Sequence, residues 1–176
     1  IEGGKALALM QRGDLDASKA LLDQLVSGGK AGWRSYNALG ILVAGSGQPQ
    51  EAGAYYDQAL KMSPGNPSVL NNKGLTLALT RDFTPAITTL TQASALAASK
   101  NHIRVQIDMN TALVHAAAGD LTRAEAIAKQ YFQGPALSNN MAFFAHLAND
   151  DALAKTYLNM ALTESKRFYA RAWNNL

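Results

Sequence analysis

A 34-residue internal period constrains the fold of this chain more than any other feature of its sequence. Polar turns mark the period at Gly13-Asp14, Gly47-Gln48 and Arg81-Asp82, which lie 34 residues apart. Two more turns, at Gly119-Asp120 and Asn149-Asp150, follow after 38 and 30 residues, so the average spacing stays at 34. A period of this length is typical of stacked supersecondary units, none of which can bury a core alone.

The stretch from Trp33 to Asn66 is the most regular unit and predicts two antiparallel helices joined by a turn. Gly40 and Ala52 remove side-chain bulk where the two helices would cross, so that the backbones can approach closely. Large side chains such as Tyr56 would fill the space beside the crossing. Pro64 cannot continue a helix and predicts the end of the unit. No apolar run in the chain favours a strand over this helical period.

This pattern resembles the tetratricopeptide repeat, a helix–turn–helix unit of 34 residues. The resemblance implies an all-α, right-handed superhelix (an α-solenoid) of about five units in a single domain. We expect the fourth unit to have gained about one turn at its start and the fifth to have lost one. The expected units are 1–29, 33–66, 67–98, 103–134 and 135–165, followed by a C-terminal capping helix at 168–176.

Composition excludes several function classes. The chain has no cysteine, which rules out disulfides, cysteine nucleophiles and thiolate metal sites. A net charge of +3 is too weak a basic bias to predict nucleic-acid binding. His102, His115 and His146 lack the spacing of a metal site. We therefore predict that the chain binds no metal or cofactor and has no enzymatic activity. No run of apolar residues in the sequence is long enough for a transmembrane helix.

Asparagine recurs at one place in the first helix of successive units. The resemblance implies that this face lines a concave groove. Asparagine is a poor helix former, so its repetition there requires an explanation. The predicted partner-binding residues of the groove are Arg34, Asn37, Asn71, Asn72, Leu75, Met109, Asn110, Asn139, Asn140, Phe143 and His146.

Two interpretations of the asparagine row stay open. Its amides can pair with the main chain of an extended peptide while Leu75 and Phe143 help to form apolar pockets. Alternatively, the asparagines hydrogen-bond to the backbone of the next repeat and set the superhelix. Arg34 likewise suits either a ligand carboxylate or a solvated position at a helix start.

A narrower resemblance covers about half of the chain. Asn110-Thr111-Ala112-Leu113, Gly119-Asp120 with Ala124-Glu125, and Asn140-Met141-Ala142-Phe143 are similar to motifs of the tetratricopeptide repeat lipoprotein of Flp/Tad pilus assembly, the TadD family. That resemblance implies a periplasmic, non-catalytic scaffold that binds the pilus secretin or inner-membrane assembly components. A lipid anchor would require a cysteine, so we expect a lipobox that was removed ahead of Ile1.

Two other functions remain as alternatives. The first is a cytoplasmic chaperone of secreted translocator proteins, similar to the tetratricopeptide repeat chaperones of type III secretion. The second is a regulatory repeat domain of a larger protein. All three interpretations share one prediction, that the chain binds a protein partner through its helical repeats.

Overall fold

The computed structural model describes residues 2–98 and 102–165, and every regular element in these ranges is an α-helix. By its internal contacts the chain divides into two compact units, unit 1 at residues 1–98 and unit 2 at residues 99–176. The predicted capping helix at 168–176 lies outside the described residues. That all five repeats form a single domain stays a prediction.

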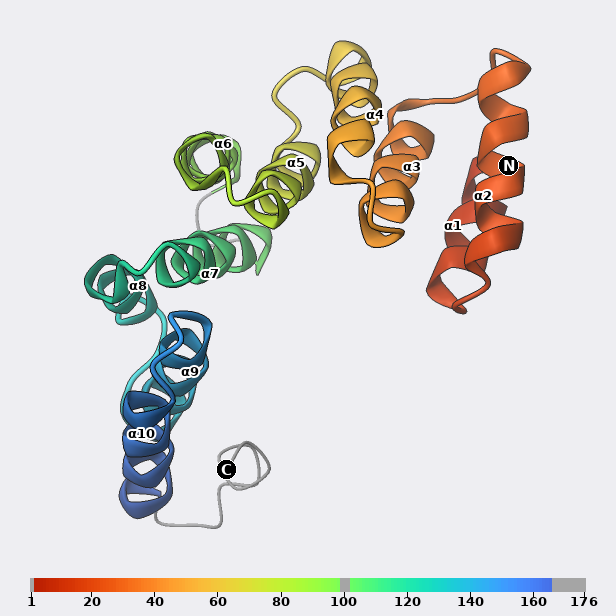
Figure 1. Cartoon of the computed structure of the whole chain (residues 1–176). Helices are drawn as coiled ribbons and strands as arrows, with labels where there is room; N and C mark the ends of the chain where they lie inside the picture. Colours follow the sequence, from red (N-terminus) through yellow and green to blue (C-terminus); the bar gives the residue numbers. More distant parts are fainter. Residues whose placement is uncertain (1, 99–101, 166–176) are drawn as a thin grey trace. The chain divides into compact units, whose positions relative to one another are not determined.

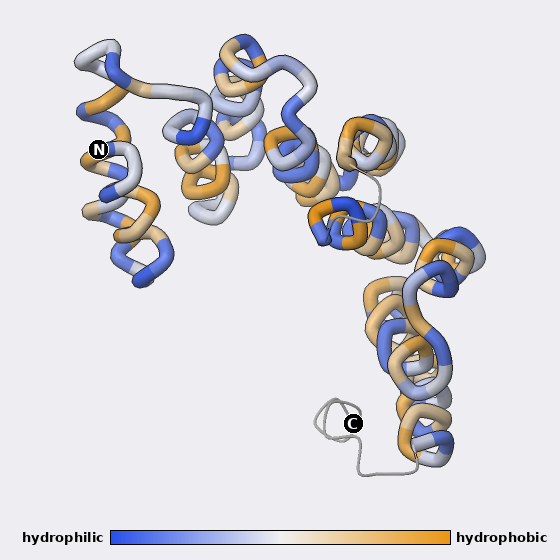
Figure 2. Tube along the Cα trace, turned by 180° about the vertical axis from the view of Figure 1, so that it is seen from behind, coloured by the Kyte–Doolittle hydropathy of each residue, from blue (hydrophilic) through white to orange (hydrophobic). Residues whose placement is uncertain are grey.

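Both units are built from antiparallel helix pairs, and each pair lies side by side in Figure 1. Figure 2 shows hydrophobic and hydrophilic residues alternating along each helix, as expected for amphipathic helices. The predicted all-α repeat architecture is therefore confirmed. Unit 1 contains α1 (Glu2–Gln11), α2 (Leu15–Ser27), α3 (Trp33–Gly45), α4 (Pro49–Met62), α5 (Pro67–Leu79) and α6 (Phe83–Leu96), and unit 2 contains α7 (His102–Ala117), α8 (Leu121–Ala128), α9 (Gly134–Leu147) and α10 (Asp151–Glu164).

The turn inside each repeat has the same backbone geometry. One residue of every turn has a positive φ: Gly13 at 82°, Gly47 at 86°, Arg81 at 61°, Gly119 at 86° and Asn149 at 62°. The next amide donates back to a carbonyl five residues earlier, as in the 3.1 Å bond from Gln48 N to Val43 O. This bond closes the end of the first helix. The 34-residue period thus marks a repeated helix stop.

In the second and third repeats the two helices cross at a glycine of the first helix. A Cβ atom added to Gly40 would lie 2.5 Å from Cε1 of Tyr56, whose ring is fully buried. A Cβ atom added to Gly74 would lie 2.7 Å from Cγ of Leu90. The hydroxyl of Thr76, on α5, donates to the Tyr56 hydroxyl at 3.2 Å. The same ring therefore fills one crossing and contacts the next repeat.

The fourth repeat departs from the others at both ends. Its first helix, α7, has 16 residues where α3 and α5 have 13, in agreement with the predicted extra turn. The shortening falls in α8, which has 8 residues, whereas α9 and α10 of the fifth repeat have 14 each. The expectation that the fifth repeat is shortened is wrong. Tyr131, just after α8, donates a hydrogen bond to Asp108 of α7 and so holds the chain against α7.

We predict that Gly40→Ala lowers the free energy of unfolding by about 1–3 kcal/mol, because the added methyl group overpacks the crossing against Tyr56. Gly53→Ala is the matched control, since a Cβ atom at Gly53 meets nothing within 4 Å. The control should raise stability by about 0.5–1 kcal/mol through helix propensity alone. Chemical denaturation of both variants measures the difference, and equal effects would contradict the proposed crossing.

Candidate functional site

Three asparagines of unit 1 form a hydrogen-bonded chain between two neighbouring repeats. Nδ2 of Asn72, on α5, donates to Oδ1 of Asn37, on α3, at 3.0 Å. Nδ2 of Asn71 donates to Oδ1 of Asn72 at 3.2 Å. Asn71 is 7% exposed, whereas Asn37 and Asn72 are half-buried. The asparagines of unit 1 therefore join the first helices of two neighbouring repeats, α3 and α5, through their side chains. The sequence had suggested a ligand or the backbone of the next repeat as their partner.

These hydrogen bonds leave part of the hydrogen-bonding capacity of the two half-buried amides, Asn37 and Asn72, for a further partner. A carboxamide has two N–H donors and two acceptor lone pairs. The bond between Asn37 and Asn72 uses one acceptor site of Asn37 and one donor of Asn72. The bond from Asn71 uses one acceptor site of Asn72. Both half-buried amides can therefore bind a further polar group without giving up their contact with each other.

Arginine and apolar side chains flank the amides. We call the surface made by Arg34, Asn37 and Ile41 of α3 and by Asn72, Leu75 and Leu79 of α5 the A-helix face of unit 1.

Within the described residues, Arg34 has no carboxylate partner, and its Cζ atom lies 4.4 Å from the ring centroid of Trp33. Leu79 is 64% exposed and Leu75 is half-buried. The face thus combines polar amides, an exposed cation and apolar side chains.

A hollow of about 340 Å³ adjoins this face between the first and second repeats. Ile41 belongs to both the face and the hollow. The other contributors were not predicted, because they come from α1, α2 and the end of α3, and only packing shows which residues of these helices border one hollow. The hollow is lined by Met10, Leu15, Asp16, Lys19, Ile41, Leu42, Gly45 and Ser46.

The predicted asparagines of unit 2 are arranged differently. Nδ2 of Asn140 donates to the carbonyl of Ala136 in its own helix at 2.9 Å. Asn110 and Asn139 are half-buried, and both have interaction partners. Met109 packs against the buried cluster that includes Met141.

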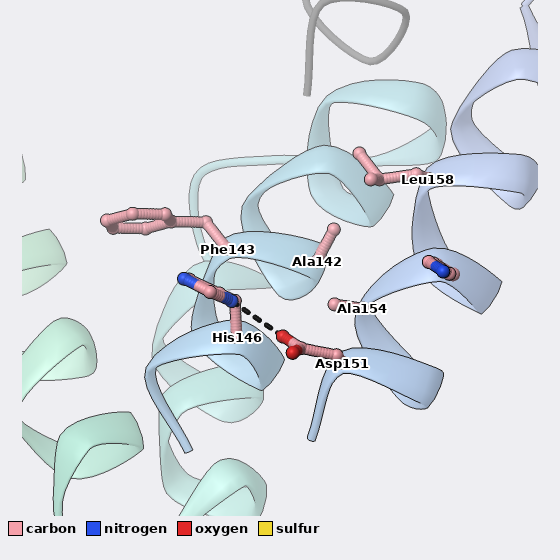
Figure 3. Close-up of a pocket in the computed structure, with 7 residues that line it drawn as sticks. Ala142, Phe143, His146, Asp151, Ala154 and Leu158 are labelled. Carbon is pink, nitrogen blue, oxygen red and sulfur yellow. Dashed lines mark hydrogen bonds and ion pairs between the residues drawn. The ribbon is translucent and has the colours of Figure 1, made fainter. Parts of the chain in front are cut away.

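Phe143 and His146, the remaining predicted residues of unit 2, line a second hollow of about 350 Å³ on α9 and α10. Figure 3 shows His146 of α9 and Asp151 of α10 pointing toward each other, with Nδ1 2.7 Å from Oδ1. Ala142, Ala154 and Leu158 form an apolar floor, and Lys155 completes the lining. Phe143 is 48% exposed. Asp151 and Lys155 were not predicted, because they lie on the second helix of the repeat.

The titratable groups of the described residues form two histidine–carboxylate contacts, His146 with Asp151 and His115 with Asp120. Among the described residues, no group of three His, Asp or Glu side chains is placed to hold a metal ion. His115 is buried, and its Nδ1 lies 3.8 Å from Oδ2 of Asp120. Burial lowers the pKa of His115, and the Asp120 carboxylate only partly offsets that effect. None of the described helices has the length and apolar composition needed to span a membrane.

Several solved structures share this fold. The chain resembles a structure from a functional characterisation of Pseudomonas aeruginosa PilF with a TM-score of 0.71 and 20% identity, over 97% of this chain and 78% of that one. For PilW, described as a widely conserved type IV pilus biogenesis factor, the TM-score is 0.75 and the identity 18%, over 98% and 80% of the two chains. A crystal structure of MamA has a TM-score of 0.65 and 14% sequence identity, and the match covers 90% of this chain and 93% of MamA. At these identities the likeness concerns the fold alone.

Comparison with protein-family models agrees with the repeat geometry. A search of curated protein sequences gives no significant match. The tetratricopeptide repeat model matches residues 4–67 and, in a second overlapping register, residues 37–102. These matches together span more than half of the sequence, and the structure repeats the same helix–turn–helix unit beyond them. The chain therefore belongs to the tetratricopeptide repeat family.

Proposed function

We propose that the chain is a non-catalytic interaction scaffold that binds a segment of a partner protein on the A-helix face of unit 1. The amide chain from Asn71 through Asn72 to Asn37 is the observation that carries this proposal. It fixes the first helices of two repeats beside each other and leaves amide groups unused on the half-buried members. A rigid surface with unused hydrogen-bonding groups binds a ligand at a lower entropic cost.

Each part of the face has a role in this proposal. The amides of Asn37 and Asn72 pair with the main chain of an extended segment, because one carboxamide offers both donors and acceptors. Leu79 and the hollow beside Ile41 receive apolar side chains of the segment. The Arg34 guanidinium, which has no carboxylate partner among the described residues, pairs with an acidic group of the ligand.

The proposal extends to the first-helix residues of unit 2 as a second contact surface. Phe143 and His146 are both exposed there, which suits direct contact with a partner. Met109 contributes through packing, since it lies against the buried cluster. The proposed contact residues of unit 2 are Met109, Asn110, Asn139, Asn140, Phe143 and His146.

We further propose that the scaffold acts in assembly of a bacterial Flp/Tad pilus, with the secretin or inner-membrane assembly components as partners on the periplasmic side. The motifs at Asn110–Leu113 and Asn140–Phe143 support this role by their resemblance to the TadD family. The fold likeness to PilF and PilW is compatible with it.

We predict that Leu79→Asp weakens partner binding by about tenfold, because it places a charge in the apolar contact. Leu96→Asp is the matched control, since Leu96 is a 51% exposed leucine near the end of α6, away from the A-helix face. Proteins retained from native membranes by the wild-type chain are identified by mass spectrometry, and their recovery is then measured for both variants. Equal recovery with both variants would contradict the proposed face.

We also predict that Asn37→Ala and Asn72→Ala are energetically coupled. Their double-mutant cycle should give a coupling free energy of about 0.5–1.5 kcal/mol in chemical denaturation. Asn37→Ala combined with Asn140→Ala is the control pair and should be additive, because the Asn140 amide bonds within its own helix. Additive effects of Asn37 and Asn72 would show that their hydrogen bond does not stabilise the repeat junction.

A further inference from the structure

The hollow beside Ile41 lies at a repeat junction whose two sides both belong to the described residues. It is bordered by α1 and α2 of the first repeat and by α3 of the second. Its aliphatic wall consists of Met10, Leu15, Ile41 and Leu42, and Leu15 is 51% exposed. A Cβ atom added to Gly45, the last residue of α3, would meet nothing within 4 Å. The hollow can therefore receive an apolar side chain of a ligand.

The equivalent junction between the second and third repeats is built differently. Its hollow is smaller, about 140 Å³, and it has Gln50 where the first junction has Asp16. Its charged side chains already have partners. Lys73 pairs with Asp57 at 2.6 Å, and Asp82 accepts a hydrogen bond from a threonine hydroxyl at 2.9 Å. A larger hollow with an acidic rim is thus a property of the first junction and not of the repeat.

Two charges without an ionic partner lie at opposite ends of this surface. Arg34 is in the first turn of α3, whereas Asp16, in the first turn of α2, borders the hollow beside the last turn of α3. Among the described residues, neither side chain forms an ion pair. Lys19, the other charged residue of the rim, is paired with Asp23 at 2.8 Å. The surface therefore has an available cation at one end and an available anion at the other.

The length of α3 sets the distance between these two ends. Gly45 follows Arg34 by eleven residues, which at 1.5 Å per residue is about 16 Å along the helix axis. An extended chain rises about 3.3 Å per residue, so about five residues of a bound segment cover this length. Asn37 and Ile41 lie between the two ends on the same side of α3, because they follow Arg34 by three and seven residues. One stripe along α3 thus connects Arg34 to the hollow.

We propose that the segment bound on this face carries an aliphatic side chain next to a basic one, and an acidic side chain about five residues away. The aliphatic side chain fills the hollow, and the basic one pairs with Asp16. The acidic side chain pairs with Arg34, while the main chain between them pairs with the amide of Asn37. Complementary charges at both ends fix the register of the segment. This inference rests on the proposed A-helix face and names the partner chemistry that the face selects.

The residues of the chain outside the described ranges do not fit this pattern. Residue 1 is isoleucine, and residues 99–101 are serine, lysine and asparagine. Residues 166–176 contain three basic residues and no acidic residue. None of these segments supplies a carboxylate for Arg34. The bound segment is therefore best provided by a different protein.

Two labelled peptides of identical composition test the proposal by fluorescence anisotropy with the full chain. In the matched peptide leucine is next to lysine, and glutamate follows at the proposed spacing after a Gly/Ser spacer. In the mismatched peptide leucine is next to glutamate, and lysine lies at the far end. The chain should bind the matched peptide about fivefold more tightly, because only this peptide places the leucine and both charges correctly. The peptides have the same net charge, so general electrostatic attraction cannot produce the preference.

Exchanging the two charges of the protein should reverse the preference. Arg34→Glu combined with Asp16→Lys leaves the net charge unchanged and should favour the mismatched peptide by a similar factor. Equal affinity of the wild-type chain for both peptides, or an unchanged preference in the exchanged variant, would overturn the proposal. Thermal melts check that the variant is folded.

Asn37→Ala separates this inference from the proposed face. It should weaken both peptides equally, because the amide pairs with the main chain and not with particular side chains. If Asn37→Ala weakens two peptides that bind with equal affinity, the A-helix face stands and only this inference fails. Failure of the face itself is measured separately, by the recovery of partner proteins with Leu79→Asp.

Gly45→Leu tests the hollow without removing any contact of the fold. The new side chain should fill the hollow and weaken the matched peptide about tenfold, while the melting temperature stays the same or rises. Gly53→Leu is the matched control, because a Cβ atom there also meets nothing within 4 Å but lies on α4, outside this hollow. Equal effects of the two variants on peptide affinity would overturn the proposal.

Two other occupants have their own readouts. Self-association of the wild-type chain in size-exclusion chromatography, abolished by the exchanged variant, would identify a second copy as the occupant and overturn the proposal. If neither peptide binds the wild-type chain, the stripe is not open to an extended segment of this chemistry, which would also overturn it.

Discussion

The close crossing of two helices within each repeat is the constraint on which the rest of the structure depends. At Gly40 the crossing leaves no room for a methyl group, because the buried ring of Tyr56 occupies that space. The hydroxyl of Tyr56 also accepts a hydrogen bond from Thr76 in the next repeat. Packing within one repeat therefore fixes part of the contact with its neighbour, as expected of a solenoid stabilised by nearest-neighbour interfaces.

The A-helix face of unit 1 follows from this arrangement. With α3 and α5 held beside each other, Asn37 and Asn72 come within 3.0 Å although they are 35 residues apart in sequence. The amide chain is thus a structural link, and its half-buried members Asn37 and Asn72 also offer further donors and acceptors. The two interpretations of the asparagine row are compatible, since one carboxamide can bind a neighbouring repeat and a ligand at once.

The fold was predictable from the sequence because its turns repeat a local requirement. Each turn needs a left-handed residue and closes the helix before it, so Gly13, Gly47 and Gly119 mark the period. Arg81 and Asn149 adopt the same geometry without glycine. The 34-residue spacing identified Arg81, whereas Asn149 was recognised as part of a polar turn. The early end of α8 at Ala128 was not predicted, and the hydrogen bond that follows it, between Tyr131 and Asp108, joins residues 23 apart that only the folded chain brings together.

The candidate sites were predictable only in part. Helical register placed Arg34, Asn37 and Asn72 on one face, but it could not show that the two amides bind each other. Asp151 and Lys155 were missed because the hollow combines two helices, and only packing shows which second-helix residues border the first.

Site-specific photo-crosslinking tests the central claim, that a partner binds the A-helix face of unit 1, most directly. A benzophenone amino acid replaces Leu75 on that face in one variant. In the control variant it replaces Gln92, an exposed residue of α6. Cells that produce each variant are irradiated while the native assembly is intact. Binding on this face should give a discrete crosslinked partner from position 75 and none from position 92. Crosslinks from position 92 alone would contradict it.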